Sequence, residues 1–364
     1  MTTDGNRNGK ALYTPPEGAP GPGAMYPRVV CLDHDESEGE TLLATFEQYE
    51  SIDNDGTGQP VFPLYRSPDG GETWSRFSEI RDMQNGWGLR YQPTLFELPE
   101  SIGPWSAGTI LAAGNSIPDD RSRTKIDVYA SEDGGRNWSS VSTVATGGKA
   151  VPQAGATPVW EPEFAIDADG NLVCYFADER HREEGYAQLV GHRVSRDGGR
   201  TWGEETFDVA IPDGEQRPGM PVVTTLPDGG YAMVFEIVGP KYDGGIFVKT
   251  SPDGRSWGEP ADIGAPVRTA EGTSSRTAPT SRGRPPAATR GPHSSQGRRC
   301  ATRTGDRPPE AAGRSSPRPI SRGSTRGRPF PRRSSSTTRS TSVTRQSGGP
   351  RRYCPRGTMN GCSS

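Results

Sequence analysis

Two glutamates of the sequence lie in apolar surroundings, where an unpaired carboxylate is costly. Glu161 follows Val159-Trp160, and Glu236 follows Val234-Phe235. Burial removes the water that stabilises a charged carboxylate, so such a group either takes a partner or has a raised pKa. Carboxyl groups with shifted pKa values are candidates for acid and base catalysis. We therefore expect Glu161 and Glu236 to belong to a functional site and not to be ordinary solvated carboxylates.

A short motif that contains an aspartate recurs along the chain. It is SPDGGETW at 67–74, SEDGGRNW at 131–138, SRDGGRTW at 195–202 and, one residue shorter, SPDGRSW at 251–257. The starts lie 64, 64 and 56 residues apart. A period in this range is the signature of a repeat architecture.

Each repeat predicts the same small antiparallel sheet. In the third repeat, β-prone segments at 160–166 and 171–176 flank a turn, and the segment 186–194 leads directly into the motif at 195–202. A fourth strand is expected after the tryptophan of the motif. Units of four strands at roughly 60 residues are typical of β-propeller blades, which close as rings of about 4–8. The sequence therefore predicts an all-β propeller with four blades in residues 26–264.

The topology of a blade separates the repeated motif from the expected functional rim. The turn after a third strand lies on the rim opposite to the first-strand starts and second-strand ends. In that turn an aspartate can accept backbone N–H bonds, a glycine permits positive φ, and a tryptophan fills the gap between strands. We therefore expect the motif aspartates to be structural: they are Asp69, Asp133, Asp197 and Asp253.

Acidic, basic and aromatic residues gather on the opposite rim, a composition that suits a sugar pocket. For any one of these acids, a solvated or ion-paired carboxylate is the alternative interpretation. Besides the two glutamates, the predicted substrate contacts are Arg28, Trp160, Glu163, Asp178, Arg180 and Arg217. Further residues on this rim are Tyr26, Glu47, Trp87, Tyr91, Gln92, Thr94, Asn115, Glu179 and Met220.

These motifs resemble a known family. The repeated motifs resemble the Asp-boxes, or BNR repeats, of the sialidase superfamily. The segments Trp160–Pro162, Tyr175–Arg180, Arg217–Met220 and Phe235-Glu236 resemble the exo-α-1,5-L-arabinanase family of six-bladed propeller glycosidases, over roughly residues 26–264. The resemblance implies a retaining glycosidase that acts on arabinan or arabino-oligosaccharides.

The same resemblance implies a role for each catalytic residue. Glu161 is implied as the general acid/base and Glu236 as the nucleophile. Glu163 competes for the acid/base role, because it lies on the same strand face two residues further along. Arg180 and Arg217 are implied as hydrogen-bond donors, or as partners that keep one glutamate ionised.

Two other functions stay open. An exo-sialidase uses three arginines to clamp the carboxylate of its substrate, and Arg28, Arg180 and Arg217 could take those places. However, that family has an Arg-Ile-Pro at the first blade, whereas the order here is Tyr26-Pro27-Arg28. The other alternative is a propeller that binds sugar without cleaving it.

The last hundred residues differ from the rest. Residues 1–264 carry 21 Lys+Arg and 42 Asp+Glu, a net of −21, whereas residues 265–364 carry 21 Arg and 3 acids, a net of +18. The two sum to the net charge of −3. Residues 265–364 contain no Leu and no Trp, so they cannot bury enough apolar area to offset their ordering entropy. We expect a flexible segment at 1–25 and a disordered tail at 265–364.

A change of reading frame explains this tail better than an RNA-binding arm does, although its charge alone would suit RNA. A one-base shift turns codons for Ser into codons for Phe, Leu, Ile or Val, and codons for Gly into codons for Trp, Arg or Gly. Applied to residues 274–285, the shift permits LLAHSPYVAWTP, whose first proline falls at 279, 58 residues after Pro221. We predict a frameshift near residue 273. We therefore expect a propeller of the six-bladed sialidase type truncated to about four blades, whose ring cannot close, so that the translated chain is impaired or inactive.

The remaining features concern location and cofactors. Residues 1–25 lack the basic start and apolar run of a signal peptide, and no apolar stretch is long enough to span a membrane. We therefore expect a cytoplasmic protein, monomeric, without membrane or nucleic-acid partners. The five Cys and four His are too scattered for a zinc knuckle, so no metal or other cofactor is expected.

Overall fold

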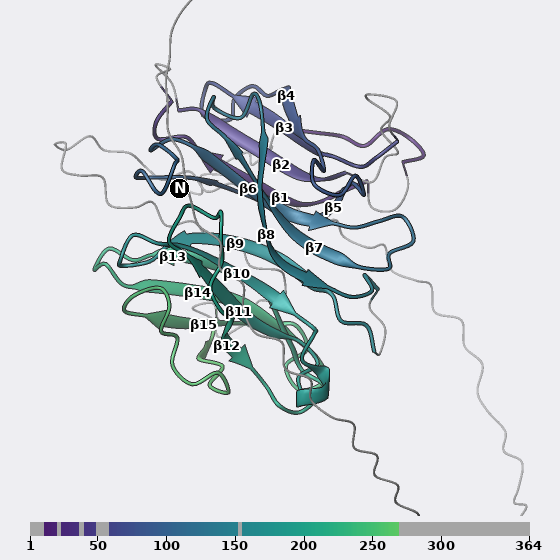
Figure 1. Cartoon of the computed structure of the whole chain (residues 1–364), viewed down its shortest axis with the longest axis vertical. Helices are drawn as coiled ribbons and strands as arrows, with labels where there is room; N and C mark the ends of the chain where they lie inside the picture. Colours follow the sequence, from purple (N-terminus) through teal and green to yellow (C-terminus); the bar gives the residue numbers. More distant parts are fainter. Residues whose placement is uncertain (1–10, 20–22, 36–39, 49–57, 152–154, 269–364) are drawn as a thin grey trace, which may run out of the picture. The chain divides into compact units, whose positions relative to one another are not determined.

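The computed structural model of the chain describes residues 11–19, 23–35, 40–48, 58–151 and 155–268. Within this part of the chain, the secondary structure is almost entirely β, and the strands form four antiparallel sheets of four strands each (Figure 1). The four sheets are the blades of a β-propeller. The predicted all-β propeller is thereby confirmed.

Each blade is a meander in which consecutive strands pair. The first blade consists of β1 (Ala24–Cys31), β2 (Leu42–Gln48), β3 (Phe62–Ser67) and β4 (Ser75–Ile80). The second consists of β5 (Leu89–Glu97), β6 (Ile110–Ser116), β7 (Thr124–Ser131) and β8 (Ser139–Gly147). The third consists of β9 (Val159–Ile166), β10 (Leu172–Asp178), β11 (Leu189–Ser195) and β12 (Thr206–Ala210), with the 3-10 turn η1 (Arg182–Glu184) between β10 and β11. The fourth consists of β13 (Arg217–Thr225), β14 (Tyr231–Val238), β15 (Gly245–Ser251) and β16 (Ala265–Pro266).

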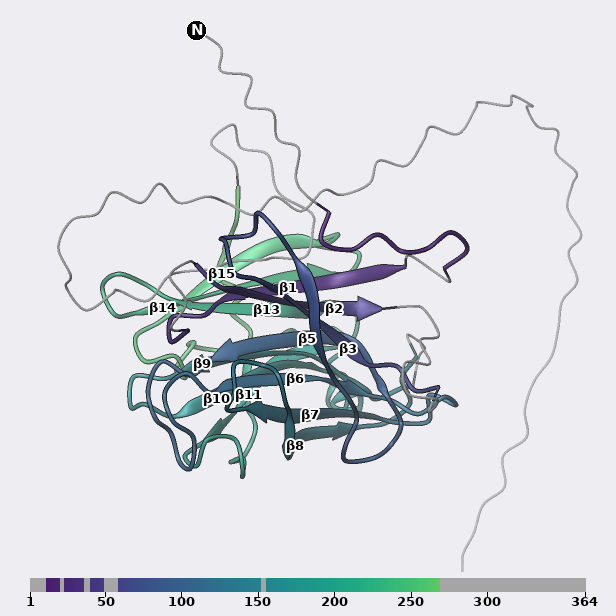
Figure 2. The ribbon, with the colours of Figure 1, turned by 90° about the horizontal axis from the view of Figure 1, so that it is seen from above.

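The blades pack face to face in chain order. Their first strands, β1, β5, β9 and β13, each contact the first strand of the next blade (Figures 1 and 2). The hydrophobic clusters lie between blades, since each combines buried residues of two neighbouring sheets. Leu43 shares a cluster with Ile110, Val128 with Phe176, and Tyr175 with Phe235.

Several expectations concern segments that the structure describes only in part. The basic tail expected at 265–364, with its predicted change of reading frame, lies beyond residue 268 almost entirely and so outside the described residues. Of the segment expected to be flexible at 1–25, residues 11–19 and 23–25 are described. Tyr13 stacks on Phe46 with ring centroids 5.0 Å apart, and β1 already begins at Ala24. No helix within the described ranges is long and apolar enough to cross a membrane.

A bulge interrupts the first strand of every blade, next to a proline. The register of β1, β5, β9 and β13 against the second strand shifts at this point. The residue before the proline has a positive φ in each case, which costs of order 1–3 kcal/mol for a residue other than glycine. Bulges re-aim side chains and are common beside active sites. The four bulge residues are Tyr26 (φ 48°), Gln92 (φ 50°), Glu161 (φ 63°) and Met220 (φ 53°).

The repeated aspartate motifs lie in the turns after the third strands, as the topology predicts. In the second blade, Asp133 Oδ1 accepts from Ser131 Oγ at 2.8 Å and from the backbone N–H of Asn137 at 2.9 Å. Its Oδ2 accepts from Asn137 Nδ2 at 2.7 Å. In the third blade, the first residue of the motif, Ser195, pairs with Leu172 at the far end of the sheet from Glu161. The motif therefore closes a turn on the rim opposite to Glu161.

The same motifs also tie neighbouring blades together. A glycine carbonyl of the motif accepts a hydrogen bond from a hydroxyl of the preceding blade. The three pairs are Ser78 Oγ to Gly135 O, Ser142 Oγ to Gly199 O, and Tyr175 Oη to Gly254 O. The repeated motif therefore has two structural roles: it stabilises its own turn, and it connects neighbouring blades.

Candidate active site

Glu161 occupies the bulge of β9 and lies at the centre of the candidate site. Its Oε2 accepts from the backbone N–H of Met220 at 2.5 Å, and its Oε1 accepts from Gln92 Nε2 at 3.5 Å. Burial raises the pKa of Glu161 to about 7, and the negative charge of Glu236 adds to this rise, whereas the Met220 hydrogen bond and Arg217 oppose it. Glu161 can therefore hold a proton near neutral pH.

Glu236 stands on β14, on the strand face that Glu161 approaches. Its backbone pairs directly with Gly219 of β13. Side chains of directly opposed residues lie on the same face of a sheet. A Cβ atom at Gly219 would lie 2.8 Å from Glu161 Oε2, so the Glu161 carboxylate covers this glycine beside Glu236. Burial raises the pKa of Glu236, and its carboxylate has no hydrogen-bond partner within the described residues.

Tyr26, the bulge residue of the first blade, completes the centre. Burial, and after it the charges of Glu161, Glu47 and Glu236, raise its pKa to about 12, while a hydrogen bond with Gln92 opposes the rise. The Gln92 backbone N–H in turn donates to Glu47 Oε1 at 2.7 Å. The bulge residues of separate blades thus meet around one point, where a phenol and two glutamates face each other.

Arg217 is held beside Glu161 by a buried carboxylate. Glu179 is only 1 % exposed, and its two oxygens accept from Arg217 Nη1 at 3.0 Å and Nη2 at 2.7 Å. Glu179 also accepts from Trp160 Nε1 at 3.0 Å and from Arg182. Sequence reasoning placed Glu179 on this rim without assigning it a role in the site. Its position directly after Asp178, at the end of a second strand, was the only feature of the sequence that could have indicated such a role.

Arg28 and Glu163 form a second pair deeper along the first strands. Arg28 Nε lies 3.9 Å from Glu163 Oε2, and both side chains are largely buried. The same Oε2 accepts from Thr94 Oγ1 at 3.2 Å. Glu163 is thus engaged by an arginine and a hydroxyl, whereas the nearest contacts of Glu161 are a backbone N–H and an amide.

Two solved structures are similar to this chain in sequence and fold. The α-L-arabinanase of Penicillium chrysogenum, solved with arabinobiose, is 38% identical over 73% of this chain and 72% of that one, with a TM-score of 0.64. A GH93 α-L-arabinofuranosidase of Fusarium graminearum, also solved with arabinobiose, is 34% identical over 72% of this chain and 71% of that one, with a TM-score of 0.63. The chain belongs to the GH93 family. No protein-family model and no curated protein matches the chain.

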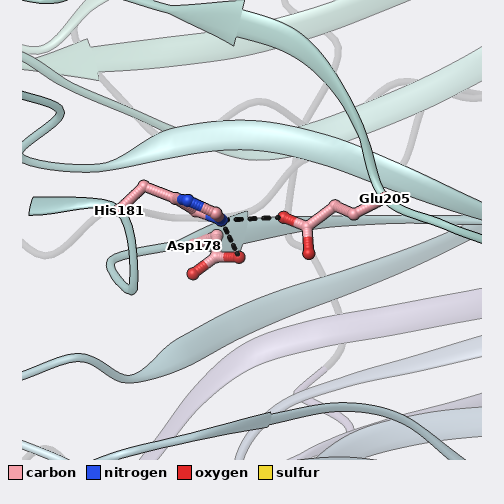
Figure 3. Close-up of side chains that lie close together, drawn as sticks. All are labelled: Asp178, His181 and Glu205. Atoms are coloured by element: carbon pink, nitrogen blue, oxygen red, sulfur yellow. Dashed lines mark ion pairs between the residues drawn. The ribbon is translucent and has the colours of Figure 1, made fainter. Parts of the chain in front are cut away.

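Two of the expected substrate contacts of this GH93 chain lie in another cluster. Asp178 and Arg180 form an ion pair with each other, and Arg180 also contacts Glu205 on the segment that leads into β12. His181 completes the cluster (Figure 3). Successive residues of an extended segment point to opposite sides. Asp178 therefore faces this cluster, while Glu179 faces Glu161 and Arg217.

Proposed function

We propose that this GH93 chain is built as an exo-acting glycoside hydrolase that removes arabinose units from α-1,5-linked arabinan or arabino-oligosaccharides, with retention at the anomeric carbon. The observation that carries the proposal is the meeting of Glu161 and Glu236 over Gly219, with the pKa of Glu161 raised to about 7. The arabinobiose complexes of the Penicillium and Fusarium relatives support the substrate class.

The mechanism divides the chemistry between the two glutamates. Protonated Glu161 donates its proton to the oxygen of the leaving sugar, while the Glu236 carboxylate attacks the anomeric carbon and the glycosidic bond breaks. The resulting ester between the sugar and Glu236 is then cleaved by water, which loses a proton to the Glu161 carboxylate. Retaining enzymes place the two carboxyl groups about 5–5.5 Å apart, and inverting enzymes place them further apart.

The burial of the site favours this division of roles. A carboxyl group with a pKa near 7 is both a competent proton donor and a competent base at neutral pH. When Glu236 is ionised, its charge helps to keep the proton on Glu161. When Glu236 is esterified in the intermediate, that charge is gone and Glu161 ionises more readily, as its second role as a base requires.

The arrangement of the arginines disfavours the sialidase alternative. A sialidase needs three guanidinium groups that are free to clamp one carboxylate. Here each candidate arginine has an acidic partner in the chain: Arg28 has Glu163, Arg180 has Asp178 and Glu205, and Arg217 has Glu179. A neutral arabinan does not require the arginines to leave these partners.

The proposal includes an impairment of the chain as translated. Residues beyond about 273 lack the apolar residues of a further blade, and a propeller without its last blades leaves unpaired strand edges. We therefore expect the translated chain to turn over arabino-oligosaccharides much more slowly than a version with the reading frame restored near codon 273. Sequencing of the DNA around this codon tests the frameshift itself.

The function is tested by incubating both versions with α-1,5-arabinotriose and following the first product by NMR. Release of sugar from one chain end with the α configuration supports the proposal. If the first product has the β configuration, the enzyme inverts the anomeric carbon and the proposed retention is wrong. Binding of the trisaccharide without turnover by the restored version would favour the sugar-binding alternative, and cleavage of sialosides in place of arabinan would overturn the proposed substrate.

A further inference from the structure

The cluster of Asp178, His181 and Glu205 has the composition and the spacing of a metal site. Asp178 is fully buried, and the side chains of Glu205 and His181 are 10% and 22% exposed. One donor atom from each residue lies within 4.8 Å of the other two (Figure 3). The three residues come from the end of β10, the turn that follows it and the segment that leads into β12.

A neighbouring carboxylate fixes the tautomer of His181. Its Nδ1 lies 2.6 Å from Glu184 Oε1, and a carboxylate oxygen can only accept, so the ring proton is on Nδ1. The lone pair of Nε2 in the neutral ring then faces the cluster. Metal-bound histidines commonly have this arrangement, in which a carboxylate orients the ring from the other nitrogen.

Two of the three atoms that face each other in the cluster have no hydrogen-bond partner. His181 Nε2 lies 3.6 Å from Asp178 Oδ2 and 3.6 Å from Glu205 Oε1. Both His181 Nε2 and Glu205 Oε1 are buried without a hydrogen bond. A lone pair that faces two carboxylate oxygens is unfavourable unless a positive charge lies between them.

The separations of His181 Nε2 from the two carboxylate oxygens suit a cation better than a proton shared with the ring. They exceed the length of a hydrogen bond, which is about 2.7–3.2 Å between heavy atoms. A tetrahedral zinc ion with bonds of about 2.0–2.2 Å holds its ligand atoms about 3.3–3.6 Å apart. The His181 distances to Asp178 and Glu205 lie at the upper end of this range.

The net charge of the surrounding side chains is compatible with a bound cation. Arg180 and Arg193 pair with Glu205 through Oε2, so Oε1 remains directed at His181. Arg180 Nε donates to both oxygens of Asp178 at 2.9 Å, and its Nη2 also contacts Oδ2, which a metal would therefore share with the arginine. With Glu184, three carboxylates face two guanidinium groups, a net charge of −1 while His181 is neutral.

We propose that Asp178, His181 and Glu205 bind a divalent transition-metal ion of the zinc type, with Glu184 as the carboxylate that orients the histidine. One nitrogen and two oxygen ligands favour a borderline cation over calcium, which prefers a shell of oxygens only. The sequence predicted no metal, because the ligands come from separate segments and follow no metal-binding motif.

Such an ion would connect two loops next to the candidate active site. It would join the turn after β10 to the segment before β12. Glu179, which directly follows the ligand Asp178, holds Arg217 beside Glu161. The metal is therefore expected to stabilise the position of this ion pair without contacting the sugar.

The test uses the full chain, treated with a chelator and then titrated with Zn²⁺ in a calorimeter. We expect about one equivalent of Zn²⁺ that wild type binds and that His181→Ala and Glu205→Gln do not. His34→Ala is the matched control, because His34 also lies beside a carboxylate, Glu97, but belongs to no cluster of three potential ligands among the described residues. Zinc bound elsewhere, for example by the cysteines of the tail, would be common to all variants, so only the difference counts.

A milder variant separates ligand loss from misfolding. Glu184 is 58% exposed, so Glu184→Gln should leave the fold intact and weaken Zn²⁺ binding about 10–100-fold. Substitution with Co²⁺ should give the visible absorption bands of a four-coordinate site in wild type and in His34→Ala only. Equal Zn²⁺ binding by wild type and His181→Ala overturns the proposal. So does the absence of binding together with a His181 that NMR shows to be doubly protonated at neutral pH.

Discussion

The backbone N–H of Met220 donates to Glu161 Oε2 over 2.5 Å and so joins the fourth blade to the third at the candidate acid. A second junction has the same form, since the Gln92 N–H donates to Glu47 Oε1. In both, a carboxylate of one blade binds the N–H of a bulge residue of the next. Because Glu161 depends on the neighbouring blade for this bond, its position and its pKa depend on the packing of the two blades.

Gly219 is expected to be essential to the site because it leaves space for two side chains. A Cβ atom there would lie 2.6 Å from Gln188 Nε2 and 2.8 Å from Glu161 Oε2. Gly219→Ala should displace the Glu161 carboxylate and lower kcat/KM of the frame-restored enzyme about 100-fold, the effect of misplacing a catalytic group by about 1 Å. The matched control is Gly230→Ala in the same blade, where the nearest atom lies 3.3 Å away. Equal activity of the two variants would contradict the arrangement.

Glu161→Gln and Glu236→Gln should each abolish hydrolysis of arabino-oligosaccharides by the frame-restored enzyme. The first change removes the proton donor, and the second removes the nucleophile. A substrate with an activated leaving group needs little protonation, so it should restore the first step in Glu161→Gln but not in Glu236→Gln. Burst kinetics with such a substrate measure this difference.

Added azide distinguishes the two glutamates further and tests Glu163 as the alternative acid. Azide can attack the glycosyl-enzyme without a general base, so it should raise turnover only in Glu161→Gln. Glu163→Gln should mainly lower the affinity for substrate or the stability of the protein, because the partners of Glu163 are Arg28 and Thr94. If Glu163→Gln instead shows the azide response and Glu161→Gln is close to wild type, the acid lies two residues further along the strand.

Asp133 is expected to matter for stability and not for chemistry. It accepts four hydrogen bonds within its turn, from Ser131, Arg136 and twice from Asn137. Asp133→Ala should lower the free energy of unfolding by about 1 kcal/mol, because the carboxylate is exposed and water partly replaces the lost bonds. Urea unfolding measures this loss against Glu132→Ala, a neighbouring exposed acid. A change in kcat without a change in stability would place the motif in the active site after all.

The repeated motifs and the prolines predicted much of the fold. The motif glycines and aspartates act within one turn, so their local spacing is enough to place the turns between third and fourth strands. The proline at the start of each first strand marked the right place but not the right conformation. The residue before proline normally takes an extended conformation. Glu161 and the equivalent residues of the other blades have a positive φ instead. The packing of neighbouring blades holds them there, and local sequence preferences do not predict this conformation.

The sequence indicated the acidic residues of the site more fully than it indicated the contacts that these residues make. Glu161 lies close enough to Glu236 and Arg217 for their charges to shift its pKa, and the apolar neighbours and strand positions of both glutamates are visible in the sequence. Their catalytic roles stay predictions. Asp178 was predicted as a substrate contact and Glu179 only as a residue of the rim, whereas Glu179 is the one that pairs with Arg217. The direction of a side chain at the end of a strand depends on one residue of register. The sequence also did not indicate that Gly219 matters. Its lack of a side chain leaves space for the Glu161 carboxylate of another blade, and this packing is not visible in the sequence.

The raised pKa of Glu161 predicts how the stability of Glu161→Gln depends on pH, whether or not the translated chain is active. The pKa is about 7 in the folded protein and 4.5 for an unperturbed carboxyl. The folded state therefore binds the proton more tightly, so the stabilisation from protonated Glu161 is complete below pH 4.5 and is lost as the pH rises through about 7. Glutamine resembles the protonated acid at every pH. Glu161→Gln should thus match wild type in urea unfolding at pH 4.5 and be the more stable protein at pH 8.5. A difference that stays constant between these pH values would show that Glu161 ionises normally, and it would remove the basis for Glu161 as the acid.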